Sequence, residues 1–251
     1  VLQWMSAVLV FLFRKYGMQP ERTTIGVVGV GNVGGLVAHY ARMWGYDVLC
    51  CDPLRQKAES LGPENGFVDL PMLLRASDIV TLHTPLTILG EHATSGLIGA
   101  DAFRQMRSGA AIINCARGGI VDEEALLCEM RSGRIVSSAV DTWEGEPDIN
   151  RALLAASDIA TPHIAGYSAQ GKAAGTSMTV CALARFFGIT PLYDWYPAEA
   201  PKSAPREITW KAVSENIGRY FDIAAQSESL KNNPEKFEEM RNGYLYREEF
   251  F

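Results

Sequence analysis

Two side chains stand near the ends of apolar stretches, one able to bind a carboxylate and the other able to transfer a proton. Arg117 lies in NCARGG, just before two glycines that leave room around it. A guanidinium can bind a carboxylate through two parallel hydrogen bonds, a geometry that lysine cannot copy. His163 follows the apolar run DIATP, and an imidazole can accept or donate a proton near neutral pH. Together these two residue types predict a site for carboxylate binding and proton transfer.

A carboxylate that orients the imidazole would complete such a site. The segment DTWEGEPD lies between the arginine and the histidine and contains Asp141, Glu144 and Glu146. One of them could hold the ring and stabilise its proton, as the third member of a catalytic array does. The spacing leaves open which of the three it is, and each taken alone is also typical of a solvated loop charge.

The elements that must bring these residues together are short strands separated by helices. Between Thr24 and Gly188, apolar runs rich in Val, Ile or Ala alternate with stretches of helical spacing. The runs are TIGVVG, DVLCC, DIVTLH, AAIINC, IVSSAVD and DIATPH. This alternation predicts the α/β class, as a doubly wound parallel sheet covered on both faces. Because ligands bind at the carboxyl ends of such strands, we expect the arginine, an acid and the histidine to meet there.

A glycine-rich turn follows the first predicted strand. Gly29, Gly31 and Gly34 form G-x-G-x-x-G at the start of a predicted helix that includes Asn32 and Val33. The first glycine permits a tight turn, the second lets the backbone approach a pyrophosphate, and the third lets helix and strand pack closely. A helix N-terminus also favours an anion. These features predict a dinucleotide site of the Rossmann type.

The choice of dinucleotide depends on the residue at the end of the next predicted strand. Asp52 stands there, at the distance expected for the acid that binds a ribose and repels a 2′-phosphate. We therefore predict NAD. Arg55 lies nearby and leaves NADP as the alternative, but it follows Pro53 rather than replacing the acid.

Composition excludes several other classes of protein. A net charge of −6 and a pI near 5.3 argue against nucleic-acid binding. The five cysteines, without a C-x-x-C pair, are typical of reduced thiols in the cytoplasm. The apolar opening of residues 1–13 is too short to span a membrane and has no preceding basic residue, so we expect neither a membrane anchor nor a signal peptide. His83 and His92 lack the spacing of metal ligands, and we expect no metal.

The chain after Gly188 has a different character. A Pro-rich connector over residues 189–207 precedes a predicted helix whose apolar face is marked by Trp210, Val213, Ile217, Phe221 and Ala224. We expect this face to pack on the main domain or on a partner subunit, because so small a segment is marginal alone.

Several longer strings resemble the D-2-hydroxyacid dehydrogenases. They are HTPL at 83–86, NCARGGIVD at 114–122, DTWEGEPDIN at 141–150 and HIAGYSAQGKAAGT at 163–176. The resemblance covers nearly the whole chain. It implies a catalytic trio of Arg117, Glu146 and His163, with Glu146 rather than Glu144 as the acid. It implies a substrate contact from Tyr167 and from Arg117. The implied cofactor contacts are the glycine turn (Gly29, Gly31, Asn32, Val33, Gly34), Asp52, Thr84, Cys115, Ala116, Arg117, Asp141 and Gly166.

The resemblance also implies a reaction and a division of the chain. We expect NAD-linked oxidation of a phosphorylated 2-hydroxy acid by a cytoplasmic homodimer. Residues 1–188 would form the NAD-binding domain, opened by a helix over 1–17, and residues 189–251 an incomplete dimerisation segment. Because the sequence begins with Val and family members carry an earlier substrate-binding segment, we expect a fragment, able to bind NAD but inactive alone. The alternatives are another substrate, such as phosphoglycerate, and a non-catalytic NAD-sensing module.

Overall fold

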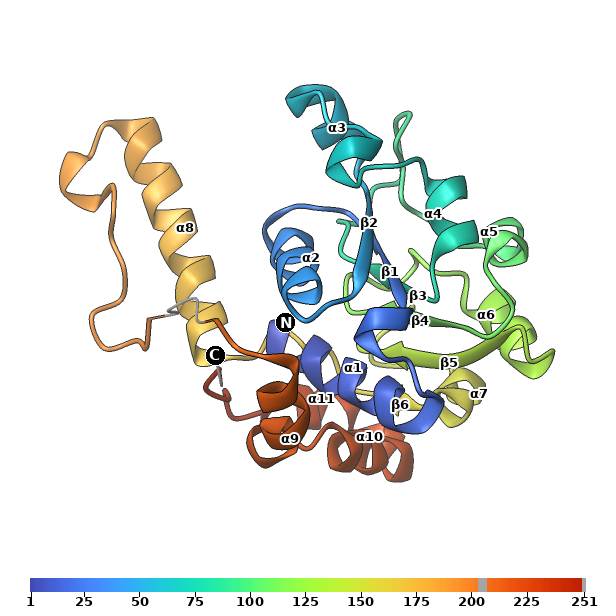
Figure 1. Cartoon of the computed structure of the whole chain (residues 1–251). Coiled ribbons are helices and arrows are strands. Elements are labelled where there is room, and N and C mark those ends of the chain that lie inside the picture. Colours follow the sequence, from blue (N-terminus) through green and yellow to red (C-terminus); the bar gives the residue numbers. More distant parts are fainter. Residues whose placement is uncertain (203–206, 250–251) are drawn as a thin grey trace.

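The protein is built around one parallel sheet with helices on both faces. The computed structural model describes residues 1–202 and 207–249 (Figure 1). The strands are β1 (Thr24–Val28), β2 (Asp47–Cys51), β3 (Ile79–Leu82), β4 (Ala110–Asn114), β5 (Ile135–Val140) and β6 (Ile159–Ala160). They form a six-stranded sheet in the order β2-β1-β3-β4-β5-β6. The predicted α/β class and its parallel sheet are confirmed.

The strands end in register, and this places the candidate residues. The last residues of neighbouring strands pair across the whole sheet, in the order Cys51, Val28, Leu82, Asn114, Val140 and Ala160. The residues that directly follow the six strands therefore all lie at the same edge of the sheet, its carboxyl edge. The chain reverses its direction across the sheet between β1 and β3, the switch point where open α/β sheets bind ligands.

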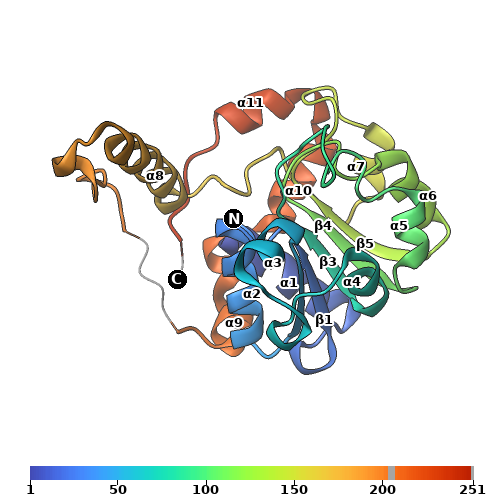
Figure 2. The same ribbon diagram turned by 90° about the horizontal axis from the view of Figure 1, so that it is seen from above.

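Alternate residues of each strand are buried on opposite faces. Ile25, Val27 and Ile79 pack in the core with α1 (Leu2–Tyr16), α2 (Asn32–Met43) and α9 (Trp210–Tyr220). The other face packs against α4 (Leu70–Ala76), α5 (Ala100–Gln105), α6 (Glu123–Arg131) and α7 (Arg151–Ala156). Figure 2 shows the strands between these two groups of helices. Burial on both faces explains why the strands appear as continuous apolar runs rather than alternating ones.

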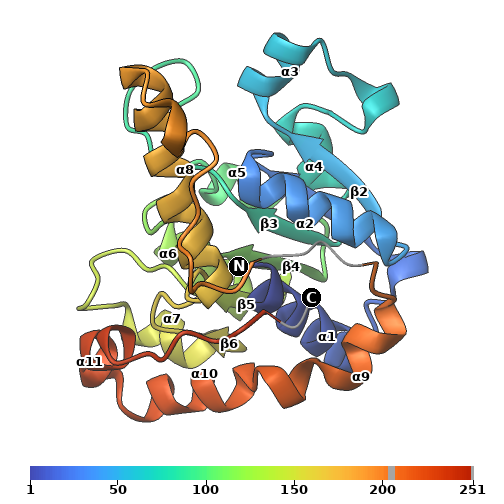
Figure 3. The same cartoon turned by 90° about the vertical axis from the view of Figure 1, so that its left-hand side faces the viewer.

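The remaining helices are peripheral or belong to the C-terminal part. They are α3 (Pro53–Glu59), α8 (Ala169–Phe187), α10 (Ile223–Asn232) and α11 (Phe237–Asn242), with short 3-10 turns at Pro20–Arg22, Pro63–Asn65, Thr190–Leu192 and Pro234–Lys236. Helix α8 stands away from the body of the molecule (Figures 1 and 2), and Figure 3 views the molecule from the side of this helix. Leu183, Phe186 and Phe187 are exposed on it.

The C-terminal segment folds back onto the main domain. Val213 and Ile217 of α9 belong to the same buried core as α1, as the sequence led us to expect. The predicted single helix through Ala224 is wrong, because α9 ends at Tyr220 and Phe221 is extended (φ −154°). Asp222 then caps α10 by accepting from the Ala225 amide. Part of the predicted connector, residues 203–206, lies outside the described residues, and the division at residue 188 stays a prediction.

Helix α1 is buried over residues 3–10 and ends at Tyr16, one residue before the predicted end at Gly17. Trp4, Val8 and Leu12 are among its buried side chains, and Gly17 closes it in the left-handed conformation (φ 67°). Within residues 1–202 and 207–249, no helix is long and apolar enough to cross a membrane. The apolar opening is therefore a core helix.

The end of α1 is tied to the sheet through Asp158. The carboxylate of Asp158 accepts hydrogen bonds from Lys15 Nζ, from the Tyr16 hydroxyl at 2.7 Å and from Ser137 Oγ at 2.7 Å. Burial raises the pKa of Asp158, but the bonds from these donors outweigh it, so the pKa lies below its usual value. The ionised form is therefore favoured in the folded protein.

Asp158→Asn is expected to lower the free energy of unfolding at pH 7 by about 1 to 2 kcal/mol. Because the folded pKa is lowered, the carboxylate stabilises the fold above the unfolded value near 3.8, and this contribution is lost as pH falls below it. Urea unfolding of both proteins should show the difference shrinking between pH 5 and pH 3. Asp47→Asn, at an exposed position, is the control. A pH-independent difference would contradict the electrostatic origin.

Candidate active site

The glycine turn between β1 and α2 is shaped by close packing at two positions and by open space at the third. Gly29 has φ 83°, and a Cβ there would lie 2.8 Å from the Thr84 amide nitrogen. A Cβ on Gly34 would lie 1.9 Å from the Gly29 carbonyl oxygen. A Cβ on Gly31 would have no described atom within 4 Å. The first and third glycines therefore serve the fold, and the second leaves a cradle open to a ligand.

The acid at the end of β2 is bound to this turn. Asp52 accepts from the Val30 amide at 2.9 Å and, as the cap of α3, from the Arg55 amide at 3.0 Å. The Arg55 guanidinium is engaged by the Val30 carbonyl at 2.7 Å and by Glu59 at 2.9 Å. Asp52 thus lies beside the cradle, while Arg55 is held by protein groups, and the ribose contact of Asp52 stays a prediction.

The end of β3 forms the other side of the cradle. Within the described residues, the buried hydroxyl of Thr84 has no hydrogen-bond partner. An orphaned buried hydroxyl at this place fits a cofactor contact, because a buried polar group otherwise costs stability. The neighbouring His83 accepts or donates at Thr81 Oγ1 (3.0 Å), and burial lowers its pKa to about 3. His83 is therefore neutral at physiological pH.

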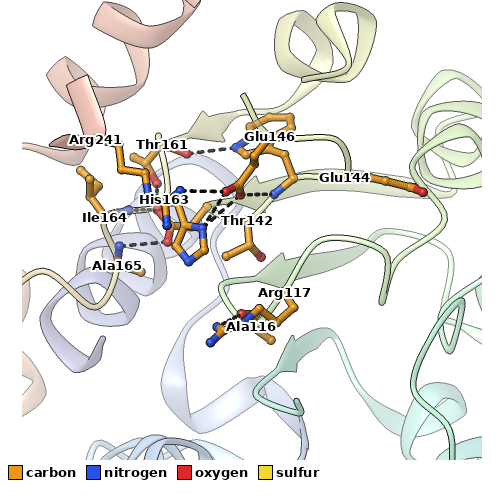
Figure 4. A network of polar contacts seen from close by, with 12 residues as sticks. Ala116, Arg117, Thr142, Glu144, Glu146, Thr161, His163, Ile164, Ala165 and Arg241 are labelled. Carbon is orange, nitrogen blue, oxygen red and sulfur yellow. Dashed lines mark hydrogen bonds and ion pairs between the residues drawn. The ribbon is translucent and has the colours of Figure 1, made fainter. Parts of the chain in front are cut away.

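Glu146 and His163 form a hydrogen-bonded pair. His163 Nδ1 lies 2.8 Å from Glu146 Oε2 and 3.1 Å from Oε1, and the Trp143 amide donates to Oε1 at 2.9 Å (Figure 4). Burial raises the pKa of Glu146, but the bonds from His163 and Trp143 outweigh it, so that the pKa lies below its usual value. The ionised acid fixes the tautomer with a proton on Nδ1, which leaves Nε2 free to accept one.

Glu144 takes no part in this pair. It is exposed and points away from the imidazole (Figure 4), while its amide donates to Glu123 at 2.8 Å. The cis peptide bond at Glu146-Pro147 follows the acid directly. The structure therefore separates the two acids that spacing alone could not, and the catalytic role of Glu146 stays a prediction.

The backbone of His163 is in the left-handed region, with φ 58°. This conformation costs a non-glycine residue about 1 to 3 kcal/mol and persists only where the surroundings impose it. Asp141, which is 1% exposed, supplies part of that constraint. Its carboxylate accepts from the Ile164 amide at 2.8 Å, the Ala165 amide at 2.9 Å and Thr161 Oγ1 at 2.5 Å, and its carbonyl accepts from the His163 amide at 2.8 Å.

Asp141 was expected to contact the cofactor. Both of its carboxylate oxygens are engaged by the loop that follows His163, in the interior of the protein. Burial raises its pKa, and the Thr161 bond opposes that shift. The structure therefore shows a loop-holding role for Asp141, and a direct cofactor contact stays a prediction.

Arg117 extends from a neighbouring loop after β4. Asn114 shapes this loop by donating to the Arg117 carbonyl at 3.1 Å and accepting from the Ala116 amide at 3.2 Å. A Cβ on Gly118 would lie 2.0 Å from the Trp143 carbonyl oxygen, so the two loops pack closely. The guanidinium is exposed and donates to the Ala116 carbonyl at 2.6 Å. The described residues include no hydrogen bond from Arg117 to the Glu146–His163 pair, although Figure 4 shows them facing the same space.

The other predicted contacts lie at the same edge. Cys115 follows β4 directly, and burial raises the pKa of its thiol to about 12, which makes it a packing group rather than a nucleophile. Gly166 is half-buried in the His163 loop, and Tyr167 is next to it. The roles of Cys115, Ala116, Gly166 and Tyr167 toward ligands stay predictions.

Several residues of the C-terminal segment reach this site, and the sequence analysis missed all of them. Arg241 of α11 lies 3.5 Å from Glu146 Oε2, the oxygen that also faces His163. Tyr244 and Tyr246 pack edge-on against the Tyr167 ring, with centroids 6.1 and 5.8 Å away. Arg247 binds the loop after His163. No spacing pattern could reveal these contacts, because they join segments about 80 to 95 residues apart.

Comparison with known proteins places this arrangement in one family. The family model described as D-isomer specific 2-hydroxyacid dehydrogenase, NAD binding domain, matches residues 11–165. The chain is 39% identical to erythronate-4-phosphate dehydrogenase of Bacteroides fragilis over 249 residues, or 99% of this chain and 70% of that protein. It is 36% identical to the enzyme of the same name from Porphyromonas gingivalis, covering 99% of this chain and 68% of that one.

Solved structures of the same kind are also similar. The D-lactate dehydrogenase of Aquifex aeolicus, complexed with NAD and lactic acid, is 26% identical with a TM-score of 0.56, over 80% of this chain and 67% of that one. The D-lactate dehydrogenase of Lactobacillus jensenii with NAD+ is 27% identical with a TM-score of 0.55, over 66% of this chain and 59% of that one.

Proposed function

The chain belongs to the D-isomer specific 2-hydroxyacid dehydrogenase family, and on that premise we propose that it takes part in NAD-dependent oxidation of 4-phospho-D-erythronate. The product would be (R)-3-hydroxy-2-oxo-4-phosphooxybutanoate, on the route to pyridoxal 5′-phosphate. The observation that carries the proposal is the His163–Glu146 pair, held at 2.8 Å on the strand edge that also carries the glycine cradle. The names of the relatives with 36–39% identity support the choice of substrate.

Each of the three catalytic residues would have a distinct role in the reaction. Nε2 of His163 would take the proton of the 2-hydroxyl, while Nδ1 keeps its hydrogen bond to Glu146. The adjacent carboxylate would stabilise the imidazolium that forms. Arg117 would hold the substrate carboxylate through its two terminal nitrogens. Bound NAD would supply the acceptor for the hydride leaving C2.

The cofactor fits the residues present around the turn. The open space at Gly31, the acid at Asp52 and the orphaned hydroxyl of Thr84 lie on adjacent strand ends. Asn32 and Val33, exposed in the first turn of α2, lie beside the cradle. NAD is favoured over NADP because Asp52 would repel a 2′-phosphate, whereas Arg55 is bound to Val30 and Glu59.

Gly31→Ala is expected to weaken NAD binding by about tenfold or more, because the added methyl would fill the space where the pyrophosphate comes closest. Its free energy of unfolding should change by less than about 0.5 kcal/mol, since the methyl meets no protein atom. Titration with NAD, followed by fluorescence, and urea unfolding would measure both quantities. Gly34→Ala is the matched comparison, since its methyl would collide with the Gly29 carbonyl and destabilise the fold. Unchanged NAD affinity in Gly31→Ala would contradict the cradle assignment.

The assembly is proposed to be a homodimer in the cytoplasm. Exposed apolar side chains on α8, among them Leu183, Phe186 and Phe187, are typical of a surface covered by a second copy. All five cysteines are free thiols, in keeping with a reducing compartment. Sedimentation equilibrium of the chain, with Phe187→Ser as the comparison, would test the dimer.

The substrate is tested by offering 4-phospho-D-erythronate, 3-phosphoglycerate and D-lactate with NAD to a version extended to the length of its relatives. Oxidation of the first in preference to the others supports the proposal. Preference for another acid would overturn the substrate assignment and keep the chemistry. Tight NAD binding without oxidation of any acid would favour a non-catalytic sensing module. Such a module needs only the glycine turn and Asp52, so it would give no reason for the presence of Arg117, Glu146 and His163.

A further inference from the structure

Arg247 is an arginine buried against the loop that follows His163. It lies in the C-terminal segment, 9% exposed, with its guanidinium carbon 4.7 Å from the centre of the Phe221 ring. Its Nη1 donates to the Ile164 carbonyl at 2.9 Å and to the Tyr167 carbonyl at 3.3 Å, and its Nη2 donates to the Ala165 carbonyl at 2.5 Å. One side chain thus takes up three carbonyl groups of a single turn.

The same turn is held from its other side by Asp141. The Ile164 and Ala165 amides donate to the Asp141 carboxylate, while the carbonyls of the same two residues accept from Arg247. Charge-assisted hydrogen bonds of this kind are stronger than neutral ones. The Ile164–Ala165 peptide group is therefore held at both ends, its amide by Asp141 and its carbonyl by Arg247.

The backbone around Arg247 reinforces this contact. The Arg247 amide donates to the Tyr167 carbonyl at 3.3 Å, and its carbonyl accepts from the Ala169 amide at 2.8 Å. The Glu249 amide donates to Gln170 Oε1 at 2.9 Å. The C-terminal segment therefore runs along the turn as a short parallel bridge rather than merely touching it.

We propose that Arg247 is a positioning residue for the reaction: its guanidinium holds the turn over residues 164–167, and this keeps the left-handed backbone of His163 and its hydrogen bond to Glu146 in place. Within the turn, Asp141 binds only the Ile164 and Ala165 amides, so the peptide groups that carry the Ala165 and Tyr167 carbonyls receive no bond from it and are held by Arg247. Without the guanidinium, the Ile164, Ala165 and Tyr167 carbonyls would lose their charged donor, and the turn could relax with the imidazole on it. A small displacement of a catalytic group is enough to slow a reaction about 100-fold.

Arg247→Met tests this role because it keeps much of the side-chain volume and removes all five donors. We expect kcat to fall about 10- to 100-fold while KM for NAD stays within about threefold, because the contacts predicted at Gly31 and Asp52 follow other strands than the turn does. Hydrogen exchange of the Ile164 and Ala165 amides should accelerate by about tenfold or more, with exchange in β1 and β3 unchanged. Arg219→Met, on the exposed side of α9, is the matched control and should change neither quantity.

Arg247→Lys and Arg247→Ala separate positioning from bulk stability. Lysine retains the charge but cannot span three carbonyls, so its kcat should lie between wild type and Arg247→Met. Added guanidinium ion at millimolar concentration should restore part of the kcat of Arg247→Ala and leave the kcat of Arg219→Met unchanged. Wild-type kcat and unchanged loop exchange in Arg247→Met would overturn the proposal. So would equal acceleration of exchange in the loop and in β1 and β3, which would indicate a purely structural role.

The turnover measurement rests on the proposed function, but the exchange measurement does not. If the extended wild-type protein oxidises no 2-hydroxy acid, the proposed function fails, and faster exchange confined to residues 164–167 in Arg247→Met still supports the hold on the turn. If the wild type is active and Arg247→Met matches it in kcat, the positioning role alone is overturned.

Discussion

Replacing His163 by asparagine is expected to lower turnover by about 10² to 10⁴-fold, or about 3 to 5 kcal/mol, while NAD affinity stays within about twofold. Asparagine removes the ring nitrogen that accepts the hydroxyl proton. It also tolerates the left-handed backbone found at this position (φ 58°), so the turn beyond it should keep its shape. Steady-state kinetics with the preferred 2-hydroxy acid, together with NAD titration, would measure the two effects separately.

The control for this change is His92→Asn. His92 is exposed in the long loop after β3 and is expected to be neutral in both assays. Near-normal turnover in His163→Asn would refute the proton-transfer role of His163. A loss of NAD binding of the same size as the loss of turnover would instead indicate that His163 serves the cofactor site.

Among the substitutions proposed for this protein, removal of the Asp141 carboxylate should lower the free energy of unfolding most. Asp141→Ala is expected to lower the free energy of unfolding by about 3 to 5 kcal/mol, because two buried amides and the Thr161 hydroxyl would lose their acceptor. The Arg247 guanidinium would also lose the buried anion on the other side of the turn. Urea unfolding monitored by tryptophan fluorescence is suited to this test, since Trp4 and Trp143 both bind Thr161.

Asp122→Ala gives the matched comparison for that loss. Asp122 is also a carboxylate that accepts from a backbone amide, but it caps α6 at the surface. Its removal should cost about 1 kcal/mol. If Asp141→Ala were no more destabilising than Asp122→Ala but lost NAD affinity, Asp141 would be primarily a cofactor ligand, as the family resemblance implies.

The strands and the residues at their ends could be predicted because they depend on local chemistry. A strand buried on both faces must be apolar along its length, and glycine is required where backbone approaches backbone, as at Gly29 and Gly34. Helix boundaries in the C-terminal part were harder to predict. The apolar spacing from Trp210 to Ala224 continues across Phe221, but the chain turns there because Asp222 caps a new helix.

By itself, the sequence determined the class of fold, the glycine turn, and the set of residues from which a catalytic group could be drawn. These follow from periodicity and from the conformational demands of single residues, which act over a few positions. Spacing left open which acid pairs with His163, the family resemblance implied Glu146, and the tertiary structure shows the contact. Only the tertiary structure decided that Asp141 and Arg247 hold the turn between them. Such contacts depend on the direction of side chains brought together from distant segments, and no local pattern encodes that direction.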